Sequence, residues 1–217
     1  MPGSREEVKM ISEIFGGKYF YDTEASEATF KNNVDRYKLV HLALHTEIDS
    51  LHPEHLKIKF SNADTHDGED NILFGHEVYT INIPADLVVL SACNTGVGKM
   101  NQGEGILSVG SAFQYAGAKS LLLSRWNISD QTTPEVMKFF YTNIKKGMSK
   151  SEALQKAKID YLDSADFLAS PPYYWGSFYI LGDVSPVELT GFYSNTFFYV
   201  GILVLLLLIG LLFFFKK

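Results

Sequence analysis

The sequence predicts an α/β fold in which a mostly parallel sheet is flanked by helices. Two apolar runs predict central strands: residues 37–46, Tyr-Lys-Leu-Val-His-Leu-Ala-Leu-His-Thr, and residues 87–96, Leu-Val-Val-Leu-Ser-Ala-Cys-Asn-Thr-Gly. Short continuous apolar runs that end in turn residues are typical of strands buried on both faces. Segments with helical spacing alternate with these runs, and this rhythm favours a parallel sheet covered by helices.

Helix start signals mark several of the intervening segments. The stretches Ser4–Glu7 and Ser149–Glu152 each match the Ser-x-x-Glu capping box, and Thr133-Pro134 matches an N-cap followed by proline. The predicted helices cover residues 4–15, 25–35, 106–116, 133–146 and 149–162. The predicted strands cover residues 18–21, 37–46, 87–90, 119–124 and 173–181, with a small hairpin near residues 56–60.

Composition excludes several classes of protein. The chain has 217 residues, of which 46% are hydrophobic, and a formal net charge of −6. One globular domain is therefore expected, and no basic stripe suggests nucleic-acid binding. The single cysteine excludes an internal disulfide and a zinc site made of thiolates. The first residues, Met-Pro-Gly-Ser-Arg-Glu-Glu, contain no apolar core and do not form a signal peptide.

The C-terminal segment predicts a membrane anchor. Residues 197–215 form a run of 19 residues without a charge, and two lysines follow it. As a helix this run is about 28 Å long, close to the hydrocarbon thickness of a bilayer. A buried core helix is the alternative, but the run has no polar face. We expect one transmembrane helix after a juxtamembrane linker at residues 184–196.

The orientation of the anchor depends on two opposed signals. The terminal lysines favour a cytoplasmic C-terminus by the positive-inside rule. The lack of a signal peptide favours a domain that stays in the cytoplasm. We expect a single-pass tail anchor whose folded domain faces the cytoplasm, where the reducing environment also suits one unpaired thiol.

His45 and Cys93 are the candidate catalytic pair. If the two apolar runs pair as parallel neighbours, both side chains lie at the carboxyl edge of the sheet, where α/β folds place their chemistry. An imidazole beside a thiol can stabilise the thiolate nucleophile and protonate a leaving amine. The alternative is that Cys93 is an inert buried residue, as most lone intracellular cysteines are.

Four histidines invite a zinc hypothesis, which their spacing does not support. They are His41, His45, His52 and His55. Leu42 stands where the helix of a zincin metalloprotease has its glutamate. Solvated loop residues account better for His52 and His55, and we predict no metal.

The glycine-rich residues 94–105 invite a second hypothesis, a phosphate loop that ends at Gly98-Lys99. Met100 replaces the Ser or Thr that would bind magnesium, and Cys93 replaces the opening glycine. We therefore predict no nucleotide and no other cofactor.

An ordered set of motifs resembles a CHAT domain, a caspase-like group of cysteine peptidases. The motifs include Tyr-Lys-Leu-Val-His-Leu-Ala-Leu-His, Val-Val-Leu-Ser-Ala-Cys-Asn-Thr-Gly, Gly-Glu-Gly, Ser-Arg-Trp-Asn-Ile-Ser-Asp and Tyr-Tyr-Trp-Gly-Ser-Phe-Tyr-Ile-Leu-Gly-Asp. The resemblance runs from about residue 2 to residue 183 and implies a caspase-like three-layer fold over residues 1–183.

The resemblance also implies roles for individual residues. Cys93 would be the nucleophile, His45 the general base, and His41 a structural residue. The backbone N–H groups of Cys93 and Thr46 would form the oxyanion hole. The segment after the strand at residues 119–124 would line the pocket for the residue before the scissile bond.

Within that segment, Trp126 and Asp130 are the candidate pocket residues. A carboxylate at Asp130 would favour a basic substrate residue by charge pairing. The alternative is that Asp130 begins the turn into the helix at residue 133.

The sequence departs from the family pattern at two places. Thr46 stands where the family usually has glycine, and a Cβ restricts the backbone there if the geometry needs a positive φ. The family domain also carries a further segment before the opening helix. The chain is therefore expected to be a fragment or an unusually short domain, whose missing strands would leave apolar surface uncovered.

Three function hypotheses follow. The first is a membrane-anchored cysteine endopeptidase that cleaves protein substrates through a Cys-His dyad. The second is a catalytically silent scaffold or sensor that works with a regulatory partner protein at the membrane, which Thr46 favours. The third is an anchored signalling domain in which Cys93 is a redox-sensitive thiol.

Overall fold

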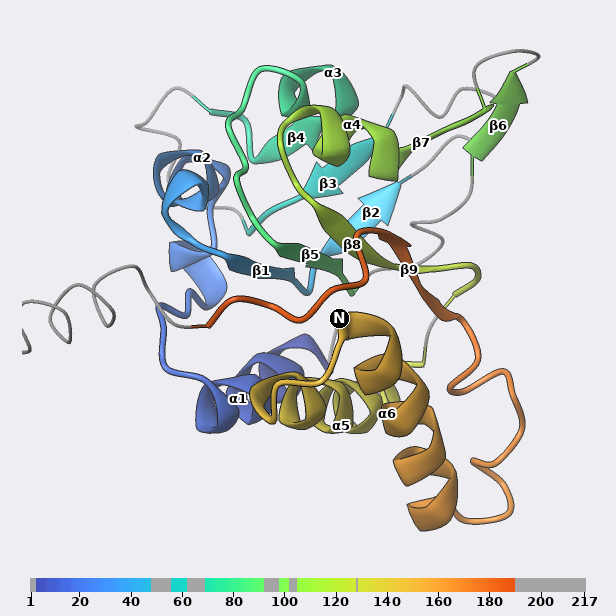
Figure 1. Ribbon diagram of the computed structural model, residues 1–217. Helices are drawn as coiled ribbons and strands as arrows, with labels where there is room; N and C mark the ends of the chain where they lie inside the picture. The colour runs from blue at the N-terminus through green and yellow to red at the C-terminus, as the bar shows by residue number, and fades with distance from the viewer. Residues whose placement is uncertain are drawn as a thin grey trace, which may run out of the picture. The chain divides into compact units, whose positions relative to one another are not determined.

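A mostly parallel sheet with the strand order β1-β5-β8-β9 runs through the centre of the domain (Figure 1). Its strands are β1 (Leu39–Leu42), β5 (Leu87–Leu90), β8 (Ser120–Ser124) and β9 (Phe178–Gly182). β1, β5 and β8 are parallel, and β9 is antiparallel to β8. The computed structural model describes residues 3–47, 56–61, 69–91, 98–101, 105–127 and 129–189.

Helices cover both faces of this sheet and produce three layers (Figure 1). One face carries α1 (Ser4–Ile14), α5 (Thr133–Lys145) and α6 (Lys150–Ser164). The other face carries α2 (Glu27–Asn33), α3 (Gly75–Val78) and α4 (Val109–Tyr115). Two short 3₁₀ helices cover Asp22–Glu24 and Val34–Arg36. The structure therefore confirms the predicted mixed α/β fold.

The side chains of β5 alternate between two apolar cores. Leu87 and Val89 pack with α1, α5 and α6, whereas Val88 and Leu90 pack with the elements on the opposite face. All four residues are buried. A strand covered on both faces needs no polar positions, which explains why its sequence is continuously apolar.

Two smaller antiparallel sheets lie outside the central one. The first joins β2 (His45–Glu47), β3 (Lys57–Lys59) and β4 (Ile72–Phe74) in that order. The second is a hairpin of β6 (Gly98–Asn101) and β7 (Gly105–Ser108). The hairpin predicted near residues 56–60 is thus correct in part, because β3 pairs with two strands instead of one.

The helix starts agree with the sequence at α6 but differ at α1. Ser149 Oγ accepts a hydrogen bond from the Glu152 N–H (3.3 Å), and Glu152 Oε2 accepts one from the Ser149 N–H (3.1 Å), so this capping box is confirmed. At α1 the predicted capping box is wrong. Gly3 occupies the N-cap and Ser4 is already helical, because Glu7 is buried against β1 and is not turned back to the helix start.

Several predicted boundaries also shift. Residues 18–21 form no strand, and the strand predicted for residues 37–46 ends at Leu42. Residues 106–108 belong to β7, so the following helix begins at Val109. These are short, strongly apolar stretches, for which periodicity alone does not separate helix from strand.

No helix within the described ranges is long and apolar enough to cross a membrane. The predicted span at residues 197–215 lies outside those ranges.

Candidate active site

The carboxyl ends of β1 and β5 lie side by side. Leu42 pairs with Leu90 in a parallel register, and the N–H of Ser91 donates a hydrogen bond to the Leu42 carbonyl (3.0 Å). Ser91 is fully buried, which fixes the point where β5 leaves the sheet. The predicted nucleophile, Cys93, follows two residues later and lies outside the described residues. The two strands are parallel neighbours, which is the condition set above for a common edge.

His45 lies in β2, not at the end of β1. It opens this strand opposite Lys59 of β3, and its side chain is exposed. The chain therefore turns out of the central sheet between Leu42 and His45. This placement corrects the single continuous strand that the sequence suggested, and it leaves the imidazole open to solvent.

Thr46, the predicted oxyanion-hole residue, is half-buried and pairs with Ile58 in β3. Among the described non-glycine residues, only Asp22 and Asn71 have a positive φ angle, so the φ angle of Thr46 is not positive. The side chain of Thr46 is thus accommodated in ordinary extended backbone without the strain that a left-handed conformation would impose.

Both ring nitrogens of His41 lie close to buried residues of two helices. Nδ1 lies 2.8 Å from the hydroxyl oxygen of Tyr141 in α5, and Nε2 lies 3.2 Å from Oε1 of Glu7 in α1. Burial, followed by the negative charge of Glu7, raises the pKa of Tyr141 well above its ordinary value. Nδ1 of His41 is thus bonded to Tyr141 and Nε2 faces the buried Glu7, which suits a structural role within the domain and disfavours His41 as a zinc ligand.

The segment after β8 reaches the same edge of the sheet, because β8 is parallel to β5. Arg125 is exposed, and its backbone N–H donates to the Ser177 carbonyl (3.1 Å). Trp126 is half-buried, and its indole N–H donates to the Tyr173 carbonyl (3.0 Å). This bond ties the predicted pocket wall to the segment before β9.

Asp130 lies in a turn that leads into α5. The N–H of Thr133 donates to the Ser129 carbonyl (3.0 Å), which closes the turn around the half-buried Asp130. A Cβ on Gly3 would come within 2.2 Å of the Asp130 carbonyl oxygen, so the start of α1 packs directly on this turn. Among the described residues, no cation lies at ion-pair distance from the Asp130 carboxylate.

Sequence reasoning did not single out Lys158 at this edge. Its Nζ reaches from α6 to the Phe178 carbonyl at the start of β9 (2.7 Å). Lys158 lies four residues after the buried Leu154 and therefore at the border of the buried face of this helix. A lysine at such a border could have indicated a partly buried cation.

A comparison with known protein families matches the CHAT domain over residues 1–183. The chain belongs to the CHAT domain family. Two curated relatives are also similar to it. Tetratricopeptide repeat protein 28 of Homo sapiens is 26% identical over 225 residues, and the Mus musculus protein of that name is 24% identical. Each match covers 88% of this chain and 9% of the relative, so the chain spans less than a tenth of their length.

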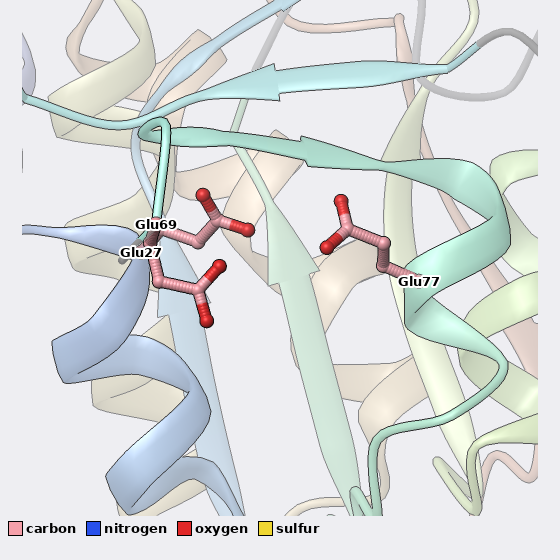
Figure 2. Close-up of side chains that lie close together, drawn as sticks. All are labelled: Glu27, Glu69 and Glu77. Atoms are coloured by element: carbon pink, nitrogen blue, oxygen red, sulfur yellow. The ribbon is translucent and has the colours of Figure 1, made fainter. Parts of the chain in front are cut away.

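This CHAT domain also contains a carboxylate cluster on the face opposite α5. Glu27 of α2, Glu69 before β4 and Glu77 of α3 point toward a shared space (Figure 2). Lys31 fills that space, with its Nζ 2.8 Å from an oxygen of each carboxylate. The ammonium group thus occupies the position that a metal ion would take.

Burial and charge act in opposite directions within this cluster. Burial raises the pKa of Glu27, whose side chain is fully buried, although Lys31 partly offsets this effect. Burial also acts to raise the pKa of Glu77, but Lys31 and the Phe74 N–H outweigh it and lower that pKa. The three carboxylates likewise outweigh burial at Lys31 and raise the lysine pKa above its usual value.

Proposed function

We propose that the chain is a cysteine endopeptidase in which Cys93 is the nucleophile and His45 the general base. One observation carries this proposal: the strand that precedes His45 and the strand that leads to Cys93 are parallel neighbours with a common carboxyl edge. Membership of the CHAT domain family, a caspase-like peptidase group, supports it.

The chemistry needs two residues and two backbone donors. The Cys93 thiolate attacks the substrate carbonyl carbon, and the N–H groups of Cys93 and Thr46 stabilise the resulting oxyanion. The His45 imidazolium then protonates the leaving amine, which leaves an acyl-enzyme. Water, deprotonated by the neutral imidazole, hydrolyses this thioester and restores the free thiol.

The proposal extends to substrate choice and location. Trp126 would form a wall of the pocket for the residue before the scissile bond, and Asp130 would favour Lys or Arg there by charge pairing. Residues 197–215 would anchor the protein in a bilayer with the domain in the cytoplasm. Substrates would then be cleaved at the membrane surface, and deletion of residues 197–217 should release a soluble domain.

A catalytically silent scaffold is the second candidate. The position of Thr46 favours it, because its backbone is that of a regular strand paired with Ile58 and not the left-handed conformation that a glycine at this position would permit. Such a module would use the same surface to bind a partner protein without cleaving it.

Labelling with a thiol-reactive peptide electrophile separates these functions. If the chain is a peptidase, Cys93 is labelled, and the labelling rate of the His45→Ala variant is at least tenfold lower. His76→Ala, which removes an exposed histidine of α3, is the matched control and should label at the parent rate. Labelling of Cys93 that ignores His45 would indicate a redox-sensitive thiol, and no labelling would indicate the silent scaffold. Peptide cleavage by Cys93→Ala at the parent rate would overturn the peptidase assignment.

A further inference from the structure

Two cationic side chains flank the start of β9 at the carboxyl edge of the sheet. The guanidinium carbon of Arg125 lies 5.0 Å from the ring centroid of Tyr179. The ammonium of Lys158 approaches from α6 and donates to the Phe178 carbonyl (2.7 Å). Since the Arg125 N–H also bonds to the Ser177 carbonyl, three consecutive residues position both cations.

Neither cation has an anionic partner in the described part of the chain. No described carboxylate lies at ion-pair distance from Arg125 or Lys158. Lys156, two residues earlier on α6, pairs instead with Asp160. Burial, followed by the positive charge of Arg125, lowers the pKa of the half-buried Lys158. An anion placed beside both groups would offset these two effects.

The register of the sheet places these cations near the proposed chemistry. Val89 of β5 pairs with Leu122 of β8, and continuing this register sets Ser91 opposite Ser124. Arg125 follows Ser124 directly, and Cys93 follows Ser91 by two residues. Because neighbouring strands lie about 4.8 Å apart, side chains of a peptide bound across this edge can reach Arg125.

We propose that Arg125 and Lys158 form a receptor for a carboxylate side chain of the peptide, so that the domain prefers Glu or Asp at one substrate position. This inference rests on the proposed peptidase function and defines its substrate class. Arg125 supplies the planar donors that pair with a carboxylate in a bidentate manner, and Lys158 supplies a point charge. The position differs from the one that faces Asp130, because that carboxylate would repel a substrate acid.

The first test measures labelling of Cys93 in the full-length chain. The probes are four-residue peptide electrophiles that differ only by Glu or Gln at each position in turn. Charge-assisted hydrogen bonds to one carboxylate predict about tenfold faster labelling for Glu at one position. In Arg125→Gln and Lys158→Met the ratio of the Glu and Gln rates should fall to about one. Lys158→Arg, which keeps the cation, should retain the preference.

The control for this test is Lys156→Met, which removes a neighbouring cation of the same helix. It should keep both the labelling rates and their ratio, because the Lys156 ammonium is already paired with Asp160. Thermal unfolding of each variant shows whether a lost preference for Glu reflects a lost fold. If Lys158→Met is unfolded, the charge-conserving Lys158→Arg variant decides whether the preference depends on the cation.

The second test does not need a reactive thiol. Fluorescent hexaglutamate and hexaglutamine peptides, blocked at both ends, are bound to the Cys93→Ala variant and followed by anisotropy. The blocked ends distinguish a side-chain carboxylate from a free C-terminus. We expect hexaglutamate to bind at least tenfold tighter, with salt dependence, and to lose this advantage when Arg125→Gln or Lys158→Met is added.

The outcomes separate the two proposals. Labelling of Cys93 without a Glu preference at any position would overturn the receptor while the peptidase stands. No labelling, combined with hexaglutamate binding that depends on Arg125 and Lys158, would end the peptidase proposal and leave the receptor. Equal binding of the two peptides would overturn the receptor in either case.

Discussion

Replacing Lys31 with methionine should destabilise the domain, because it removes the cation that balances three carboxylates. The Lys31 ammonium lies 2.8 Å from each carboxylate, and the Glu27 side chain is 0% exposed. Removing one partner of a buried pair costs about 3–5 kcal/mol, since the remaining charge is left uncompensated. The Lys31 side chain is 21% exposed, so water reduces this penalty, and we expect a loss of about 3 kcal/mol. For a domain of this size, that loss lowers Tm by about 6–12 °C.

Thermal unfolding at pH 7 measures this loss of stability. Two further variants test whether it comes from the unpaired buried charge. Lys156→Met breaks an ion pair whose side chains are 48% and 24% exposed, and it should change stability by less than about 0.5 kcal/mol. Combining Lys31→Met with Glu27→Gln removes the buried charge as well as its partner. Most of the lost stability should then return.

The stability lost in Lys31→Met should also depend on pH, because Glu27 titrates. The pKa of Glu27 is already raised by burial, and without Lys31 it rises further. A carboxyl group with a raised folded-state pKa contributes stability below its unfolded pKa, and this contribution is lost as the pH rises through the folded pKa. The Lys31→Met deficit should therefore shrink as the pH falls from 7 toward 4. A loss below about 1 kcal/mol at pH 7, or no recovery in the double variant, would refute this account.

Two other predictions concern a buried tyrosine and an exposed aspartate. Tyr141→Phe leaves Nδ1 of His41 without its partner in the α1–α5 core, and it should cost about 1–2 kcal/mol in chemical denaturation; a neutral effect would mean that this hydroxyl does not hold His41. Hydrogen bonds from Ser185, followed by Lys150, lower the pKa of Asp183 to about 2, so its stabilising effect is present above the ordinary pKa and is lost as the pH falls from about 4 to 2. Asp183→Asn should therefore be less stable than the parent at pH 7 and equal to it near pH 2 by urea unfolding, and a constant difference across that range would contradict the assignment.

The sequence predicted the central sheet well, because burial on both faces leaves a strong pattern. Leu121 and Leu123 of β8 pack on one side of the sheet and Leu122 on the other, so an uninterrupted apolar run identifies the strand without reference to its neighbours. The comparable runs that became β1 and β5 indicated the edge at which the candidate residues were expected. The strand order was not predicted, because the sequence rhythm indicates a mostly parallel sheet but not which strands are neighbours.

The prediction from sequence was wrong where a residue of a local motif makes a distant contact instead of the local one. The Ser4–Glu7 stretch matches a capping box, yet Glu7 is buried beside His41 on another element. Its neighbour His41 is 34 residues away in the sequence, so the four-residue motif alone does not indicate this contact. Likewise Arg125 and Lys158 are distant in the sequence, and only the structure shows that both contact residues 177–178 at the start of β9.

His45 is exposed because the chain leaves β1 before it enters β2. One continuous strand would have placed this side chain differently. Successive side chains of a strand alternate between faces, so residues four apart share a face. His41 faces α1 and α5, and an unbroken strand would have turned His45 toward the same helix-covered side. Because the strand ends at Leu42 and the chain enters β2, His45 is exposed whereas His41 is enclosed. Two histidines that are alike in sequence thus receive opposite environments, and the exposed one is the proposed general base.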